Sequence, residues 1–477
     1  MTDRYPGPRW EMAYGSRDGV ERCAVDQLHR AVSRFLPYVV RLAPAAGASA
    51  PQEGHRIVVG TPESSPLVAE LCRTGTLKLP AEPESYAVTC AASPWNSERR
   101  LLAVAGADPK GVLNGVMALD AMLSSRQGLE GLGDLSLSDH PRVANRGIWC
   151  WGYTVYDYRR FLDNMARLRM NMLTLWNDIP PVNCAEVIEY AHSRGVKVVL
   201  GFAWGWGKKY DLASAAERGR LRDDVVREYD QHYQGLPHDG IYFQTLTEHH
   251  NTSVGGVTVA SIVCGLVNET AGALLDRHPG LHIQFGLHAT SILDNCTDLA
   301  GLDPRVAIVW EDAGVIPYSY SPVPDTTTEG ENFATALDTP EKTLAYSRTI
   351  AALRPGTPFG LVPKGWMTLD WKNEFENHGA FILGERSPEF IRERLAKRQP
   401  RWDRVNALWE QHYRHAVTFY REMLAVNPTG MIAAGLVEDG LFEEKIQPSV
   451  ALLGEMLWDP TREPEQILAA AQSRFYG

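Results

Sequence analysis

Aromatic, acidic and histidine side chains recur directly after short apolar runs across the middle of the chain. They are Trp151, Trp176, Asp178, Trp204, Trp206, Glu248, His249, His250, His288, Trp310, Glu311, Asp312, Trp366 and Asp370. Aromatic faces stack on the C–H surfaces of sugar rings, while polar side chains hydrogen-bond the hydroxyl groups. A single tryptophan is more often a core residue. Tryptophans after five separate runs indicate a carbohydrate-binding cleft.

Two of these carboxylates form the leading candidate pair for cleaving a glycosidic bond, which requires an acid for the departing oxygen and a second carboxylate as base or nucleophile. Glu248 follows the run GIYFQ, and apolar neighbours raise a carboxyl pKa, so it is the candidate acid. Glu311 and Asp312 are adjacent, and neighbouring strand residues point to opposite sides, so Glu311 ranks first as its partner. Asp370 and either Glu438 or Asp439 are further base candidates. The alternative for each of these carboxylates is a structural role, as the partner in a salt bridge or as the cap of a helix or loop.

Two cations are expected near these acids. Lys364 and Arg146 are the candidates, and either side chain would bind a sugar hydroxyl or a uronate carboxylate. The alternative is that each forms an ion pair with the acidic side chains around it. The sequence leaves both readings open.

The elements that position these residues repeat as strand, loop and helix at the spacing of βα units. The expected strands are 146–151, 172–176, 197–202, 240–245, 281–287, 305–310, 359–363 and 431–437, with 380–384 as the alternative for the last. Amphipathic stretches at 158–168 and 184–193 predict helices between them. Eight such units predict an α/β fold, a (β/α)₈ barrel, whose functional residues gather at the carboxyl ends of the strands.

The flanking segments predict two further parts. Residues 1–140 combine β-rich runs at 55–60, 86–90 and 101–105 with a helical run at 110–122, which indicates a small α+β accessory domain. The barrel is expected over 141–445, with a helical insertion at about 387–426. Residues 446–477 are expected to form terminal helices.

Charge and composition restrict the classes of molecule that the chain is expected to bind and the compartment in which it is expected to act. The formal net charge is −11 and no dense run of Lys or Arg occurs, which argues against binding to nucleic acid or to an anionic membrane. The start MTDRYPGPRW lacks the pattern of a signal peptide, and no apolar stretch is long enough to cross a bilayer, so we expect a cytoplasmic protein.

The seven cysteines are scattered and free of CxxC spacing, which favours reduced thiols. Assembly into a homo-oligomer is left open.

At these residues the chain resembles glycoside hydrolases built from a small α+β domain, a (β/α)₈ barrel and terminal helices, the plan shared by family 67 α-glucuronidases and, more distantly, family 20 hexosaminidases. The segment AGADPKGVLNGVMALDAML is similar to the non-catalytic domain before those barrels, and Arg146-Gly147 resembles the RG that opens their first strand. GIYFQTLTEHH is similar in placement to the family 67 segment that ends in its general acid, which implies that role for Glu248. VALLGEMLWDP resembles the closing helix.

The chain also departs from both families. Hexosaminidases with substrate-assisted chemistry carry an Asp-Glu pair at this strand end, where this chain has Thr247-Glu248, so the resemblance does not imply that mechanism. Family 67 enzymes have an Asp and a Glu as paired bases on later strands. Glu311 matches one of them, and the second stays open between Asp312 and Asp370.

Three hypotheses follow. The preferred one is an exo-acting glycosidase that removes a terminal sugar, such as a uronic acid or amino sugar, from a short oligosaccharide without a cofactor or metal. The second is a metal-dependent barrel isomerase, lyase or aldolase that uses Glu248, His249, His250, His288 and Asp312 as ligands. The third is a sugar-binding protein without catalysis.

Overall fold

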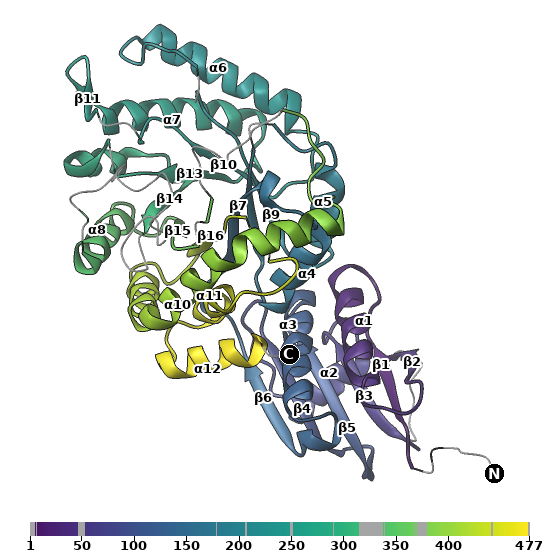
Figure 1. Cartoon of the computed structure of the whole chain (residues 1–477). Coiled ribbons are helices and arrows are strands. Elements are labelled where there is room, and N and C mark those ends of the chain that lie inside the picture. Colours follow the sequence, from purple (N-terminus) through teal and green to yellow (C-terminus); the bar gives the residue numbers. More distant parts are fainter. Residues whose placement is uncertain are drawn as a thin grey trace.

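The computed structural model of the chain describes residues 5, 7–45, 53–177, 179–205, 208–248, 251–289, 291–313, 337, 339–366, 368–369, 379–439 and 442–475. These residues form a small α/β part at the N-terminal end and a larger barrel surrounded by helices (Figure 1).

A six-stranded sheet organises the N-terminal part, in the order β2-β1-β3-β5-β4-β6. Its elements are β1 (Trp10–Tyr14), α1 (Gly19–Ser33), β2 (Arg41–Pro44), β3 (His55–Gly60), α2 (Pro66–Arg73), β4 (Tyr86–Ser93), β5 (Asn96–Gly106), α3 (Pro109–Ser125), η2 (Glu130–Leu132) and β6 (Leu135–Asp139). Helices α1 and α3 pack on one face of the sheet and α2 on the other, so strand residues alternate between two apolar layers. The strands expected at 55–60, 86–90 and 101–105 are confirmed.

Eight parallel strands close into a barrel, which confirms the expected fold class. They are β7 (Asn145–Trp151), β8 (Met172–Trp176), β9 (Lys197–Gly201), β10 (Gly240–Gln244), β13 (Ile283–Leu287), β14 (Val306–Ala313), β15 (Phe359–Pro363) and β16 (Ile432–Leu436). The eighth strand is therefore the later of the two alternatives. It pairs with β7 in register, Ile432 opposite Asn145, and closes the ring.

The helices that follow the N-terminal part lie between successive barrel strands and cover the outside of the barrel, except α11 and α12, which come after the last strand (Figure 1). They are η3 (Gly152–Thr154), α4 (Tyr158–Arg167), α5 (Cys184–His192), α6 (Ala215–His232), α7 (Val259–Arg277), η4 (Leu293–Gly301), α8 (Pro340–Ala352), α10 (Pro388–Val426), α11 (Pro448–Trp458) and α12 (Pro464–Phe475). A short hairpin, β11 (Ser253–Val254) with β12 (Val257–Thr258), precedes α7. The long α10 takes the place of the crossover helix between the seventh and eighth strands, and α11 follows the eighth.

Two apolar layers stabilise the barrel. The larger lies between the strands and the surrounding helices. The smaller fills the interior and contains Trp149, Met172, Trp176, Val199, Tyr242, Ala307, Val309, Val362, Ile432, Ala434 and Leu436. Successive strand residues therefore point alternately to the helices and to the interior, as the period of two requires.

Helix α7 corrects the expectation that no apolar stretch is long enough to cross a bilayer, because in the described ranges it is the one helix with that length and composition. Of its most apolar stretch, 56% is buried against the rest of the structure. A helix that packs on a barrel has this kind of burial. All seven cysteines are free thiols, and Cys90, Cys150, Cys184 and Cys296 are buried.

Candidate active site

A polar cluster lies at the carboxyl ends of the barrel strands, directly above the apolar interior layer. The alternation that points Tyr242, Val309 and Val362 inward also points the residues two positions later inward. Gln244 therefore faces the interior at the end of β10, Glu311 near the end of β14 and Lys364 just past β15. These side chains meet because their strands are neighbours around the barrel, in the order β10-β13-β14-β15.

Glu311 is at the centre of this cluster and is 2% exposed. Its Oε1 accepts hydrogen bonds from the Tyr242 hydroxyl and the Gln244 amide, and its Oε2 lies 3.2 Å from Lys364 Nζ and 3.2 Å from His288 Nε2. Burial alone would raise the pKa of Glu311. The positive charges of His288 and Lys364, with hydrogen bonds from His288 and Tyr242, outweigh burial and hold that pKa well below its usual range. Glu311 is therefore an ionised carboxylate at neutral pH.

Gly286 of β13 leaves the space that the Tyr242–Glu311 hydrogen bond occupies. A Cβ at position 286 would lie 2.2 Å from Tyr242 Oη and 2.4 Å from Glu311 Oε1. We expect Gly286→Ala to force these groups apart and to lower the free energy of unfolding by about 1–3 kcal/mol, the usual cost of overpacking. Urea denaturation measures this change.

The matched control is Gly272→Ala in α7, where no heavy atom lies within 4 Å of the added Cβ. Alanine is a better helix former than glycine by about 1 kcal/mol, so this variant should be at least as stable as the wild type. If the two variants had the same stability, the space at Gly286 would have no special importance.

His288 links three carboxylates. Its Nδ1 lies 2.9 Å from Asp312 Oδ1, and its Nε2 lies 3.2 Å from Glu311 Oε2 and 3.8 Å from Glu248 Oε1. Burial alone would lower the pKa of His288. The negative charges of Glu311, Glu248 and Asp312, with the hydrogen bond to Asp312, raise it well above its usual value. His288 is therefore held as an imidazolium.

Asp312 fixes the orientation of that ring. Its Oδ2 accepts the backbone N–H of Ala289 at 2.6 Å, and its Oδ1 faces His288. Strand alternation would place Glu311 and Asp312 on opposite sides of β14. Asp312 is placed to position His288.

Glu248 is more exposed than its partners, because 17% of its side-chain surface is accessible compared with 1% for His288 and 2% for Glu311. A turn at Leu246, whose φ is +58°, follows β10 and precedes Glu248. Thr247 holds this loop in place, since its Oγ1 accepts the backbone N–H of His288 at 3.2 Å. Burial raises the pKa of Glu248, and the negative charge of Glu311 adds to this effect while the charge of His288 opposes it.

The cluster therefore holds two carboxyl groups whose pKa values are shifted in opposite directions. Glu248 is biased toward its protonated form and Glu311 toward its ionised form, and both face the same nitrogen of His288. Such a pair can provide an acid and an anion at the same pH.

The metal hypothesis requires several side chains that converge on one ion. Within the described ranges, no group of three or more His, Cys, Asp or Glu side chains is arranged to hold a metal ion. His249 and His250, two of the ligands considered for that hypothesis, lie outside the described residues.

An aromatic group borders the polar cluster. Trp149, Trp151, Trp176 and Tyr242 have ring centroids 5.2–6.1 Å apart, in stacked and edge-to-face pairs. Trp176 is 4% exposed, whereas Trp151 is half-buried. Trp151 is thus the predicted tryptophan, among those described, that keeps accessible surface for a ligand.

Three other predicted binding residues require correction. Trp204 stacks on Phe243 at a centroid distance of 3.4 Å, and Trp366 stacks on Trp409 of α10 at 4.0 Å. The indole nitrogen of Trp310 donates to Ser347 of α8 at 3.0 Å. All three are at most 1% exposed. They pack between the strand ends and the surrounding structure, so they cannot stack on a ligand in the barrel mouth.

Arg146 also requires correction. It lies at the start of β7, at the opposite end of the barrel from the cluster, and is 1% exposed. Its guanidinium group forms an ion pair with Glu84 of the N-terminal part and lies 5.1 Å from the ring centroid of Trp458. Its role is to join the two parts of the chain. The amino-terminal ends of barrel strands are the end associated with stability rather than with chemistry.

The remaining predicted residues fall into two groups. Asp178, Trp206, His249, His250 and Asp370 lie outside the described residues. Asp439 is bound by the Tyr156 hydroxyl, Arg398 and, at 3.0 Å, Arg394, which makes it part of a buried ion-pair network. Glu438 is fully buried, and its Oε2 accepts the backbone N–H of Leu369 at 3.4 Å.

Sequence reasoning missed Trp149, Tyr242, Gln244 and Gly286. A signal for the first three was present in the alternation along their strands. Trp149 precedes Trp151 by two positions, and Tyr242 and Gln244 alternate along GIYFQ. Gly286 gives no such signal, since its importance depends on side chains from two neighbouring strands.

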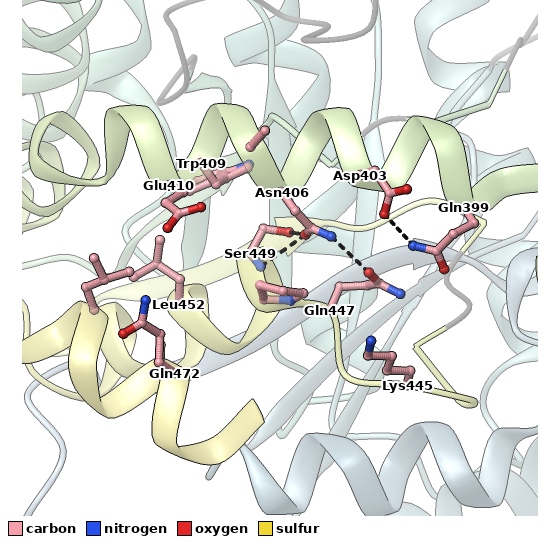
Figure 2. A pocket seen from close by; sticks show the side chains of 14 residues that line it. Gln399, Asp403, Asn406, Trp409, Glu410, Lys445, Gln447, Ser449, Leu452 and Gln472 are labelled. Carbon is pink, nitrogen blue, oxygen red and sulfur yellow. Dashed lines mark hydrogen bonds between the residues drawn. The ribbon is translucent and has the colours of Figure 1, made fainter. Parts of the chain in front are cut away.

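A separate surface cavity of about 360 Å³ lies outside the barrel, between α10, α11 and α12 (Figure 2). Asn406 donates to Gln447 at 3.0 Å and accepts from Ser449, and Gln399 donates to Asp403 at 2.6 Å. These polar side chains bind one another and tie the terminal helices together. None of the strand-end cluster lines this cavity.

No protein-family model matches the sequence, and a search of curated proteins finds no match. Among solved structures, the chain is similar to a family 138 glycoside hydrolase described as targeting pectin rhamnogalacturonan II, with a TM-score of 0.52, 12% identity, and coverage of 96% of this chain and 52% of that chain. The chain thus spans about half the length of that enzyme.

Two further glycoside hydrolases align at lower scores. They are the β-N-acetylhexosaminidase from Bacteroides fragilis (TM-score 0.48, 14% identity, 98% of this chain and 87% of that chain) and the Flavobacterium johnsoniae chitobiase (0.48, 11%, 98% and 69%). At such identities the likeness to solved structures shows the fold alone. The barrel fold that the resemblance to glycoside hydrolases implies is confirmed, and the closer likeness to family 67 stays a prediction.

Proposed function

We propose that the chain is a glycoside hydrolase in which Glu248 is the general acid and Glu311 is its ionised partner. One observation carries this proposal: the two carboxyl groups face the same His288 nitrogen at the carboxyl ends of the barrel strands, with pKa values shifted in opposite directions. Glycosidic cleavage needs this division between a proton donor and a carboxylate.

In the proposed mechanism Glu248 donates its proton to the glycosidic oxygen as the bond to the anomeric carbon breaks. Positive charge then develops on the sugar ring, and the negative charge of Glu311 stabilises it. A water molecule forms the new bond to the anomeric carbon and gives up its proton to a carboxylate, which completes the hydrolysis. Lys364 and His288 keep Glu311 ionised and fixed in place. Trp151, at the edge of the cluster, provides a face on which a sugar ring stacks.

The substrate is proposed to be a short oligosaccharide or glycoside that loses a terminal sugar, such as a uronic acid or an amino sugar. Location in the cytoplasm and the absence of nucleic-acid and membrane partners remain predictions from the sequence.

The direct test is a panel of chromogenic aryl glycosides that includes uronides and N-acetylamino sugars. Release of the chromophore from any one class of glycoside supports the proposal. If the protein binds sugars but releases the chromophore from none of the glycosides, the sugar-binding hypothesis is favoured.

The pH dependence of kcat/KM provides a second test. The acid must be protonated, so kcat/KM should be high below the raised pKa of Glu248 and fall as the pH rises through it. The positive charge of His288 lowers the pKa of Glu248, so His288→Gln should move this alkaline limb to higher pH. The measurement is a pH profile of the wild type and the variant on the same alkyl glycoside, whose leaving oxygen needs the proton. A limb at the same pH in both proteins would contradict the assignment of Glu248.

A further inference from the structure

A second candidate site lies at the junction between the N-terminal part and the barrel, away from the strand-end cluster. Two surface cavities of about 480 Å³ and 790 Å³ adjoin there and share Cys23, Arg30 and Arg194 as lining residues. We call the two cavities together the junction groove. One wall is α1 of the N-terminal part, and the other is α4 with the end of α5 (Figure 1).

Helical spacing explains how the two walls face each other. Cys23, Gln27 and Arg30 lie four and three positions apart on α1, and Asp163 and Arg167 lie four apart on α4, so each set occupies one helix face. The groove is therefore lined by side chains from both parts of the chain. A ligand in it would contact the two parts at once.

The charge of the junction groove is opposite to that of the whole chain. Seven Arg or Lys side chains and four carboxylates line it, an excess of three positive charges, while the chain carries −11. A concave, cation-lined surface on an acidic protein concentrates the field where an anion would enter.

Among the described residues, most of these cations have carboxylate partners, but Arg30 does not. Arg17 pairs with Asp26 at 2.7 Å and Arg194 with Asp163 at 2.8 Å. Arg30 donates to the neutral Gln27 at 2.8 Å, and no ion pair involves it within the described ranges. It lies where the two cavities meet. The uncompensated guanidinium is thus at the centre of the groove.

Glu443 adds a second observation on the barrel side of the groove. Its Oε1 accepts the backbone N–H groups of Tyr156 at 2.6 Å and Asp157 at 3.4 Å, while its buried Oε2 has no hydrogen-bond partner in the described part of the chain. Burial raises the pKa of Glu443 to about 7. In its protonated form this side chain is neutral and can donate a hydrogen bond. It therefore does not repel an anion that enters the groove.

We propose that the junction groove binds a small polyvalent anion that carries phosphate or carboxylate groups. Guanidinium groups bind both with paired, charge-assisted hydrogen bonds. Such a ligand bridges α1 and α4 and stabilises the docking of the N-terminal part on the barrel. This inference is independent of the proposed glycosidase activity.

The test is thermal unfolding of the full chain with inorganic pyrophosphate or citrate, at an ionic strength held constant with sodium chloride. We expect a saturable rise in Tm with at least one of the two anions, because a ligand that binds only the folded state raises stability with concentration. A rise with pyrophosphate alone supports a phosphorylated ligand, and a rise with both supports polyanions of either kind. No rise beyond the chloride control would overturn the proposal.

Arg30→Gln identifies the site. The side chain is exposed and its loss removes a single hydrogen bond to Gln27, so the variant should fold normally. We expect its affinity for the stabilising anion to fall by about tenfold, the effect of losing one charge-assisted contact. Arg220→Gln on α6, where an exposed arginine pairs with Glu217, is the matched control and should bind as the wild type does. Equal affinities in the two variants would place the anion elsewhere.

Discussion

Glu248→Gln is expected to abolish nearly all turnover, with a fall in kcat of about 10²–10⁴-fold, while the fold and sugar binding persist. Glutamine has almost the same shape as glutamate but cannot donate a carboxyl proton to the leaving oxygen. Glu248 is 17% exposed and is already biased toward its neutral form, so a neutral amide should fit the same space. Kinetics with an alkyl glycoside, whose leaving oxygen needs the proton, and equilibrium binding of the product sugar measure the two effects separately.

The leaving group provides the control for this prediction. An aryl glycoside with a strongly acidic phenol departs without protonation, so Glu248→Gln should lose far less activity on it than on an alkyl glycoside. Glu269→Gln, an exposed position on α7, is the matched substitution outside the cluster and should leave kcat unchanged on both. An equal loss on both classes of substrate would argue that Glu248 acts in some way other than as the acid.

Glu311→Gln is expected to reduce stability as well as activity. The substitution removes the buried carboxylate that faces Lys364 Nζ and His288 Nε2, each at 3.2 Å, and leaves those two cations without their central anion. Removing one partner from a buried ion pair costs about 3–5 kcal/mol. We therefore expect the free energy of unfolding at pH 7 to fall by about this amount, as measured by urea denaturation.

The pH dependence of this loss has a defined sign. The pKa of Glu311 is lower in the folded chain than the value of about 4.3 for an unperturbed glutamate, so its ionisation stabilises the fold above that value. This stabilisation is lost as the pH falls through the lowered pKa. The gap between wild type and Glu311→Gln should therefore be largest near neutral pH and shrink in strong acid. Glu269→Gln should show no such gap at any pH.

The tryptophans show how far residue types alone predict a site. The tryptophans predicted at five strand ends lie at the end of the barrel where polar side chains gather, but Trp204, Trp310 and Trp366 proved to be core residues. Alternation carried the missing information for Trp310: because Glu311 next to it faces inward, Trp310 must face the helices. The prediction applied this rule to the two acids and not to the aromatic residue.

Arg146 shows a second limit. It begins β7, and the start of a barrel strand lies at the end away from the cluster. Its partner Glu84 belongs to the N-terminal part, 62 positions earlier. Nothing local in the sequence identifies that pairing, because it depends on how the two parts of the chain dock.

The sequence by itself determined seven of the eight strands and their order along the chain, left two alternatives for the eighth, and identified the strand ends that carry Glu248, His288, Glu311 and Lys364. These features follow from local rules: the period of apolar residues, the residues that end helices and the spacing of βα units. Only the tertiary structure decided that His288 Nε2 faces both glutamates, and that Tyr242, Gln244 and Lys364 surround Glu311. Barrel closure brings these distant positions together, and the resulting burial and mutual charges set which carboxyl group keeps its proton.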